Sequence, residues 1–393
     1  MKKILFVALA ATFLAAGCQK TEIINRVGDS IGFSTELGKI TKALGDAEDE
    51  GIDNLQKQGI LVSAFYVADD PNKAGAVAGS VYDGMDKSPL IYKDATWTPD
   101  KEYYWPGKGK YLNFFAVSGL VAFNNETEDY ELNPDAVTIS STEIKVTDFT
   151  VDPKNANVDL MVADLVQQSQ DEKTKVALKF NHVLSKVEFI FKTTKDTKET
   201  IFVQKLVVKD LHNKNTFTAT APEAVAKGTN AMTLSWDKLE VAAEGTDFED
   251  DYDVDFADTE SAKFPTSYTE FDADHKITDK KAMWLNPVAT DSDIKPFTTW
   301  LMIPQPITGK EVEVTYLIDN RQFVAVFPLD VTNTLDAWEP NQYVKYTVTL
   351  APNKIEFAPE VKPWDPTVDV DPEMGEVITP ENSGDDNGNG EEA

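Results

Sequence analysis

The amino-acid sequence predicts an all-β protein built from two β-sandwich domains in tandem. Short runs of β-branched and aromatic residues recur along the 393-residue chain and are separated by Gly, Pro, Asp and Asn. Helical periodicity of about 3.6 residues is scarce throughout. A polar break at residues 167–175 divides the strand signals into two series, which fits the usual domain size of about 150 residues.

The chain begins with the pattern of a bacterial lipoprotein signal. A charged start at residues 1–3 and an apolar run at 4–14 precede Ala-Ala-Gly at 15–17 and then Cys18, the only cysteine. The apolar run is short for a membrane span, and small residues are typical of a signal cleavage site. We therefore expect removal of residues 1–17 and lipid on Cys18, which would hold the mature chain on a membrane. The alternative is an ordinary signal peptide with an incidental cysteine.

The first domain is expected to start with a strand around Ile31 and Phe33, whose side chains alternate with polar neighbours. We assign residues 18–58 to this lipidated strand and to an exposed loop, because 37–58 are rich in Gly, Asp, Glu and Lys. The remainder of the first sandwich is expected at 59–172. Its strand signals lie at 60–66, 90–93, 102–105 and 111–117, and residues 156–166 fit either a strand or a short helix.

The second sandwich is expected at residues 173–365. Its strand signals lie at 176–180, 187–191, 202–209, 216–220, 298–303, 312–318, 322–327 and 343–350. An acidic stretch at 246–273 is expected to be a loop or an irregular excursion. Residues 366–393 are acidic and rich in Gly and Asn, which predicts a disordered tail.

The charge and cysteine content exclude several classes of function. Acidic residues number 67 against 37 basic ones, so the net charge of −30 opposes binding to nucleic acid. With Cys18 assigned to lipid, the mature fold has no cysteine for disulfides, metal sites or thiol catalysis. We expect no cofactor.

No motif supports catalysis or a metal site. Gly28 and Gly32 flank Ser30 in a G-x-S-x-G pattern, but a nucleophile elbow needs a strand-to-helix turn within alternating strands and helices, which this region lacks. His182 has no second ligand at metal-ligand spacing, so a structural role is favoured over metal binding. The acidic residues of 247–260 could gather around calcium, although a solvated, self-repelling loop is favoured. Gly and Lys at 107–110 are interpreted as a hairpin turn.

Seven tryptophans are present, and the alternative function that we weighed is glycan binding by a surface lipoprotein. Exposed aromatic rings around Trp97, Trp105 or Trp284 would stack on sugars. Most large aromatic residues are nevertheless expected in the core of a β-sandwich.

Residues 178–189 resemble the F-x-H-A-L-S-K-V signature of the fimbrillin family, the Mfa-like type V pilins of Gram-negative bacteria, with Val183 at the alanine position. Other segments add to the resemblance: 31–34, 41–43 (similar to the family's T-R-A), Trp105 with Pro106, 300–305, and 343–350 followed by Trp364. The signature residues are Phe180, His182, Leu184, Ser185, Lys186 and Val187.

The resemblance implies two transthyretin-like, Greek-key β-sandwiches and a structural role in a surface fimbria as stalk, tip or anchor. For stalk subunits, it implies that an envelope Arg/Lys-specific protease cuts the loop after the first strand, and that a strand of another fimbrial subunit fills the groove. Here the displaced strand would carry Ile31 and Phe33, and the cut would follow Lys42 or its neighbour Lys39. The expected partners are therefore other subunits, the outer membrane through lipid, this protease, and a host protein or glycan.

Two features depart from the family pattern. Lys42 stands where an arginine would be expected, so another protease could act or the lipid anchor could be permanent. The segment after Trp364 has few apolar residues for a donor strand, whose apolar and polar residues should alternate. Stalk, tip and anchor roles therefore remain open.

Overall fold

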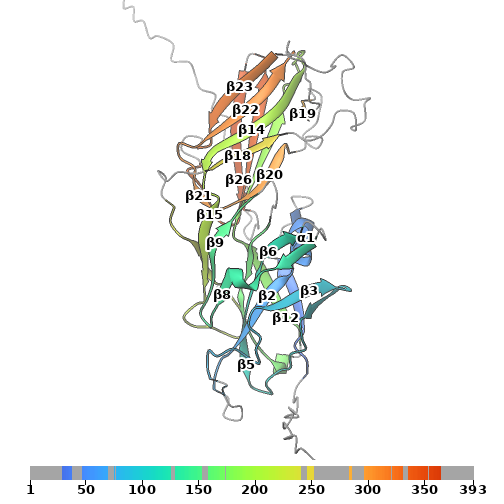
Figure 1. Ribbon diagram of the computed structural model, residues 1–393, viewed down its shortest axis with the longest axis vertical. Coiled ribbons are helices and arrows are strands. Elements are labelled where there is room, and N and C mark those ends of the chain that lie inside the picture. The colour runs from blue at the N-terminus through green and yellow to red at the C-terminus, as the bar shows by residue number, and fades with distance from the viewer. Residues whose placement is uncertain are drawn as a thin grey trace, which may run out of the picture.

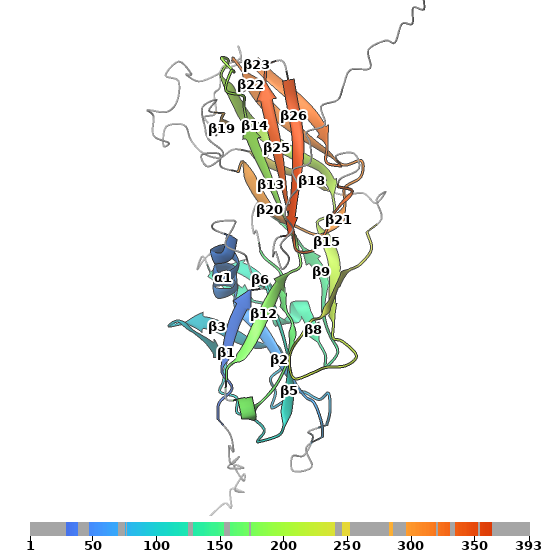
Figure 2. The same ribbon diagram turned by 180° about the vertical axis from the view of Figure 1, so that it is seen from behind.

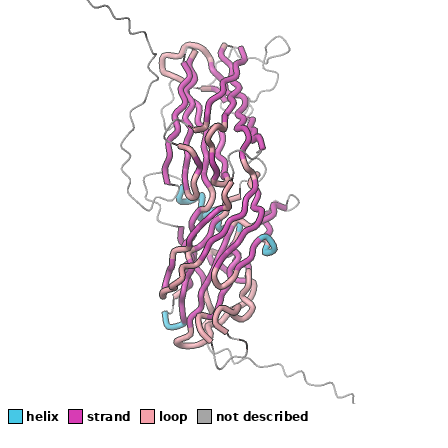
Figure 3. Tube along the Cα trace, turned by 90° about the vertical axis from the view of Figure 1, so that its left-hand side faces the viewer, coloured by secondary structure: helices cyan, strands magenta, loops and turns pink. Residues whose placement is uncertain are grey.

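The computed structural model describes residues 29–37, 47–69, 75, 77–124, 129–152, 158–172, 174–239, 246–251, 283–285, 296–319, 321–330, 335–352 and 354–363. These residues form an elongated molecule in which two groups of sheets lie one above the other along the long axis (Figure 1). Strands dominate both groups (Figure 3). The all-β class expected from the sequence is confirmed. Within the described residues, none of the helices has the length and apolarity needed to cross a lipid bilayer.

The lower group is built around a ring of strands. In order of pairing, the ring contains β1 (Phe33–Leu37), β4 (Thr96–Pro99), β3 (Ser88–Lys93), β2 (Ile60–Tyr66), β5 (Tyr111–Ser118), β10 (Met161–Ala163) and β12 (Val176–His182). It closes because β12 pairs with both β10 and β1. β11 (Leu165–Ser169) also pairs with β5 and carries β16 (Gly228–Asn230) on its other side.

The inner face of the ring is apolar because alternate residues of its strands point inward. Ile60, Val62 and Ala64 of β2 are fully buried in the same hydrophobic cluster as Phe33 and Phe180. α1 (Ala47–Gln58) contributes Leu55 to this cluster and contacts β1 and β3. The helix therefore covers part of the ring.

The expectation of an exposed loop through residue 58 is wrong for 47–58, which form α1. Its residues include few large apolar side chains, chiefly Ile52 and Leu55, so no helical stripe is visible in the sequence. Leu55 becomes buried only because the ring lies beneath it. Two short strands, β6 (Val121–Asn124) and β7 (Asp129–Leu132), pair beside the helix.

A second sheet covers the outer face of the ring. Its order is β17 (Thr233–Trp236), β15 (Lys214–Thr220), β9 (Glu143–Thr150) and β8 (Val137–Ile139), with the short helix η1 (Pro134–Ala136) before β8. Leu61 and Phe115 on the ring share a buried cluster with Ile144 and Phe217 of this sheet.

The upper group is a sandwich of two sheets. One contains β20 (Thr298–Met302), β13 (Ser185–Lys192), β25 (Gln342–Ala351) and β26 (Lys354–Pro363). The other contains β18 (Thr246–Asp251), β14 (Ile201–Leu211), β22 (Glu311–Ile318) and β23 (Arg321–Pro328), with β19 (Met283–Trp284) also on β14. β21 (Gln305–Pro306) pairs with β24 (Ala337–Trp338).

The predicted division at residues 167–175 is wrong. These residues end β11, form the short helix η2 (Gln170–Glu172) and lead into β12, which belongs to the lower ring. The chain crosses to the upper group only after His182, and β15, β16 and β17 return to the lower group. The polar break is a surface turn, whereas the true crossing at Val183 and Leu184 is apolar because it is fully buried.

Two smaller expectations also need correction. Residues 102–105 form no strand, and the backbone of Tyr104 pairs with Ser30 in an isolated bridge. The acidic stretch at 246–273 begins with a regular strand, β18, which pairs antiparallel with β14. As an edge strand, β18 tolerates charged residues. Residues 252–282 lie outside the described residues, as do residues 1–28 and the predicted tail.

Candidate functional site

The candidate site is the place of β1 in the lower ring. β1 lies parallel to β12 and pairs with it along its whole length, from Phe33 opposite Val176 to Leu37 opposite Phe180. Figure 2 shows the blue β1 beside the green β12. On its other side, the ladder between β1 and β4 consists of one pair, Phe33 and Trp97. β1 is thus firmly paired on one side and weakly paired on the other.

The side chains of this segment fill the ring. Phe33 is 1% exposed and packs edge-on against Phe114, with ring centroids 5.9 Å apart. Ile31 is also buried, just before the strand begins. Its N–H donates to the carbonyl of Tyr103 at 2.7 Å. Removing this segment would open an apolar trough beside the free edge of β12.

The signature at 178–189 spans the crossing between the two groups. Phe180 is buried in the ring, and Leu184 and Val187 are buried in the larger cluster that continues into the upper group. The Ser185 hydroxyl donates to the carbonyl of Glu339 at 2.8 Å. The Lys186 ammonium lies 5.5 Å from the ring centroid of Tyr343. The signature therefore connects the ring to the first strand of the upper sandwich.

His182 is buried at the end of β12, where its imidazole contacts the carboxylate of Asp159. Its Nδ1 lies 2.9 Å from Asp159 Oδ2, and both residues are almost wholly inaccessible to solvent. The amide of Gln58, at the end of α1, makes two hydrogen bonds of 3.1 Å with the backbone of Asp159 when its nitrogen faces the carbonyl. This buried contact joins α1, β12 and the segment before β10.

Gly119 packs directly against the same segment. Its φ is +89°, and a Cβ atom there would lie 2.2 Å from the carbonyl oxygen of Asp159. Sequence reasoning missed Asp159, Gln58 and Gly119. Because they are far apart in the chain and form no motif, only the fold brings them together.

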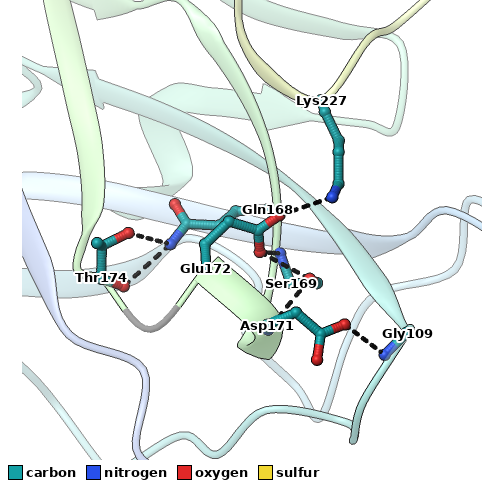
Figure 4. Close-up of polar contacts among 7 residues, drawn as sticks. All are labelled: Gly109, Gln168, Ser169, Asp171, Glu172, Thr174 and Lys227. Atoms are coloured by element: carbon teal, nitrogen blue, oxygen red, sulfur yellow. Dashed lines mark hydrogen bonds and ion pairs between the residues drawn. The ribbon is translucent and has the colours of Figure 1, made fainter.

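A polar cluster holds the turn that leads into β12 (Figure 4). Glu172 accepts hydrogen bonds from the backbone N–H and the hydroxyl of Ser169, at 2.7 and 2.6 Å, and pairs with Lys227 at 3.2 Å. The N–H of Gly109 donates to Asp171 at 3.0 Å. Burial opposes ionisation, but the hydrogen bonds from Ser169 and Lys227 outweigh it and hold the pKa of Glu172 below its ordinary value.

The structure contradicts the glycan platform at two of its three tryptophans. Trp97 and Trp105 are 8% and 6% exposed and belong to the ring core, so neither presents a ring face for sugar stacking. The side chain of Trp284 lies outside the described residues.

Ser30 does not lie on the strand-to-helix turn that a nucleophile elbow needs. This serine makes a single bridge with Tyr104 just before β1, and no helix follows it directly. In the part of the chain that the structure describes, no group of three or more His, Cys, Asp or Glu is placed to hold a metal ion. Cys18, Lys39 and Lys42 lie outside the described residues, as does most of the acidic segment 247–260.

Comparison with known proteins gives one family. The family model described as Fimbrillin-like matches residues 47–364. No curated protein matches.

Two solved structures with a similar chain come from Bacteroides and Parabacteroides. A fimbrial protein from Bacteroides vulgatus ATCC 8482 is 16% identical with a TM-score of 0.49, and the match covers 85% of this chain and 99% of that one. A fimbrial assembly protein from Parabacteroides distasonis ATCC 8503 is 12% identical with a TM-score of 0.34, and the match covers 85% and 98%.

Proposed function

Because the chain belongs to the fimbrillin-like family, we propose that it is a structural subunit of a cell-surface fimbria, exported as a lipoprotein and assembled by strand exchange. Its role is mechanical and not enzymatic. In this proposal, Cys18 carries lipid that takes the precursor to the outer membrane. An envelope Arg/Lys-specific protease then cuts between β1 and α1, after Lys42 or Lys39.

The observation that carries the proposal is the place of β1 in the ring. Phe33 of β1 and Ile31 just before it supply buried side chains to the core, and residues 38–46, between β1 and α1, contain both candidate cleavage sites. Losing β1 would leave unpaired N–H and C=O groups on β12 beside an apolar trough. An extended segment of another subunit can satisfy both.

The test uses the mature chain and a trypsin-like protease, followed by mass spectrometry and electron microscopy. We expect an early cut after Lys42 or Lys39, retention of the β1 fragment in the folded protein, and polymers once that fragment is displaced. A Lys39→Gln/Lys42→Gln variant is the matched control and should stay uncut in this region. If nothing is cut between residues 39 and 57 and no polymer forms, the stalk role is excluded.

A further inference from the structure

A side-chain hydrogen bond joins β1 to β4, its weakly paired neighbour. The indole Nε1–H of Trp97 donates to the hydroxyl oxygen of Thr35 at 3.0 Å. Trp97 is 8% exposed, and its ring packs against Tyr92 with centroids 5.2 Å apart. The indole N–H can only donate, so this hydrogen bond gives it an acceptor inside the protein.

The contact follows from the register of the strands. Trp97 stands opposite Phe33 in the β1–β4 ladder, and Thr35 is two residues further along on the same face of β1. Diagonal neighbours of this kind lie within reach of a large aromatic side chain. The indole therefore contacts the residue at the Thr35 position, two residues after the one at the Phe33 position.

We propose that Trp97 is a specificity-determining residue of the strand-exchange groove. The incoming strand must place large apolar side chains at the Ile31 and Phe33 sites and a side-chain oxygen acceptor, such as a Ser or Thr hydroxyl, at the Thr35 site. This inference rests on the proposed strand exchange. A purely apolar strand would fill the trough but leave the buried indole N–H without an acceptor, which weakens binding.

The need for a hydroxyl at the Thr35 site also limits which segments can serve as the incoming strand. Within residues 364–393, no stretch places two large apolar residues and a hydroxyl at alternate positions. Val368 and Val370 are followed by Pro372, and Val377 and Thr379 are preceded by Gly375. Residues 364–393 of a second copy therefore do not fit the groove, and the partner that fits is an extended segment that carries this pattern.

The test measures peptide binding to the groove independently of natural cleavage at Lys39 or Lys42. In the mature chain, residues 38–46 are replaced by the recognition sequence of a specific protease, so that cutting does not depend on Lys42. After cleavage, a fluorescent peptide of residues 28–37 displaces the native strand, and its dissociation constant is measured by anisotropy. The same measurement is made with the Thr35→Ser and Thr35→Val variants of this peptide and with a peptide of residues 366–380. Each peptide is tested on the protein with Trp97 and on the Trp97→Phe variant.

We expect the Thr35→Val peptide to bind the Trp97 protein about 10-fold more weakly than the native peptide, which corresponds to about 1.4 kcal/mol. The Thr35→Ser peptide should stay within about 3-fold of the native one, and the 366–380 peptide should bind more weakly than either. On the Trp97→Phe protein, the Thr and Val peptides should bind alike, because the donor is gone. If this protein does not fold, the Ser and Val peptides on the Trp97 protein still decide.

Equal or tighter binding of the Val peptide to the Trp97 protein would overturn the specificity role while leaving strand exchange intact. If the native peptide itself fails to bind, strand exchange is contradicted, and the role of Trp97 falls with it.

Discussion

At the residue scale, the buried surroundings of Asp159 leave no room for an added side chain at Gly119. Gly119 approaches the Asp159 backbone too closely for any side chain, and His182 pairs with the Asp159 carboxylate in the interior. Both contacts lie at the end of the lower ring, next to the point where the chain crosses to the upper group.

Gly119→Ala should destabilise the protein by more than about 3 kcal/mol, because the new Cβ adds a steric clash to the cost of a positive φ. Gly109→Ala is the matched control, since Gly109 also has a positive φ, at +70°, but open space around it. It should cost only about 1 kcal/mol. Urea unfolding measures both, and equal losses would exclude the close approach as the cause.

His182→Leu should destabilise the protein by about 3 kcal/mol, because it leaves the Asp159 carboxylate buried without the imidazole. Adding Asp159→Asn should recover part of this loss, since a buried neutral amide costs less than a buried charge. Chemical denaturation of the two variants makes the comparison. A double variant less stable than His182→Leu alone would show that His182 does not stabilise the protein through its contact with Asp159.

At the element scale, β12 is the strand on which the proposed function depends, because it is the neighbour that β1 or its replacement must pair with. The turn before it is fixed by the polar cluster around Glu172 (Figure 4). Because this cluster holds the start of β12 in position, less conformational entropy is lost when an incoming strand pairs with it.

The pKa of Glu172 makes this cluster pH-dependent. Its folded-state pKa is lowered, so the ionised carboxylate contributes stability above the unfolded-state pKa, and this contribution is lost as the pH falls through the folded-state pKa. Glu172→Gln should therefore be less stable than the unaltered protein at pH 7, by less than about 1 kcal/mol for so exposed a pair. The difference should shrink below about pH 4.

Thermal unfolding from pH 7 to the acid range measures this difference. Glu223→Gln, at an exposed glutamate of the same region, is the control and should differ from the unaltered protein by less than about 0.5 kcal/mol at every pH. A Glu172→Gln deficit that grows on acidification would contradict the lowered pKa.

At the scale of the whole molecule, one hydrophobic cluster runs from the lower group into the upper one. It includes Phe115 and Ile144 below and Phe189 and Tyr346 above, with Leu184 at the crossing. The indole N–H of Trp236 donates to the carbonyl of Val183 at 2.8 Å, which ties the returning strand β17 to this crossing. The two groups share their core instead of meeting through a polar linker.

Calorimetry should therefore record one cooperative unfolding transition for the described fold. Leu184→Ala should lower its stability by about 3 kcal/mol, because it opens a cavity where the groups join. Ile91→Ala, at a position 48% exposed, should change it by less than about 0.5 kcal/mol. Two separate transitions in the unaltered protein would contradict a shared core.

Much of the strand pattern could be predicted because alternation and β-branched composition act locally. The expected strand at 60–66 coincides with β2, whereas the strand expected around Ile31 and Phe33 corresponds to β1, which begins only at Phe33. α1 could not be predicted, since only the ring beneath it buries Leu55. The alternative hypothesis that exposes Trp97 for sugar binding is wrong, and nothing in the local sequence of Trp97 shows that β4 closes the ring beside β1.

By itself, the sequence determined the all-β class, most strand positions and the segment that marks the family, because each depends on residues close together in the chain. Only the tertiary structure decided where the chain crosses between the two groups and which buried partners surround His182. It alone placed Trp97 over Thr35, residues that are 62 positions apart. Such contacts depend on which distant strands pair, and strand pairing leaves no local mark in either partner.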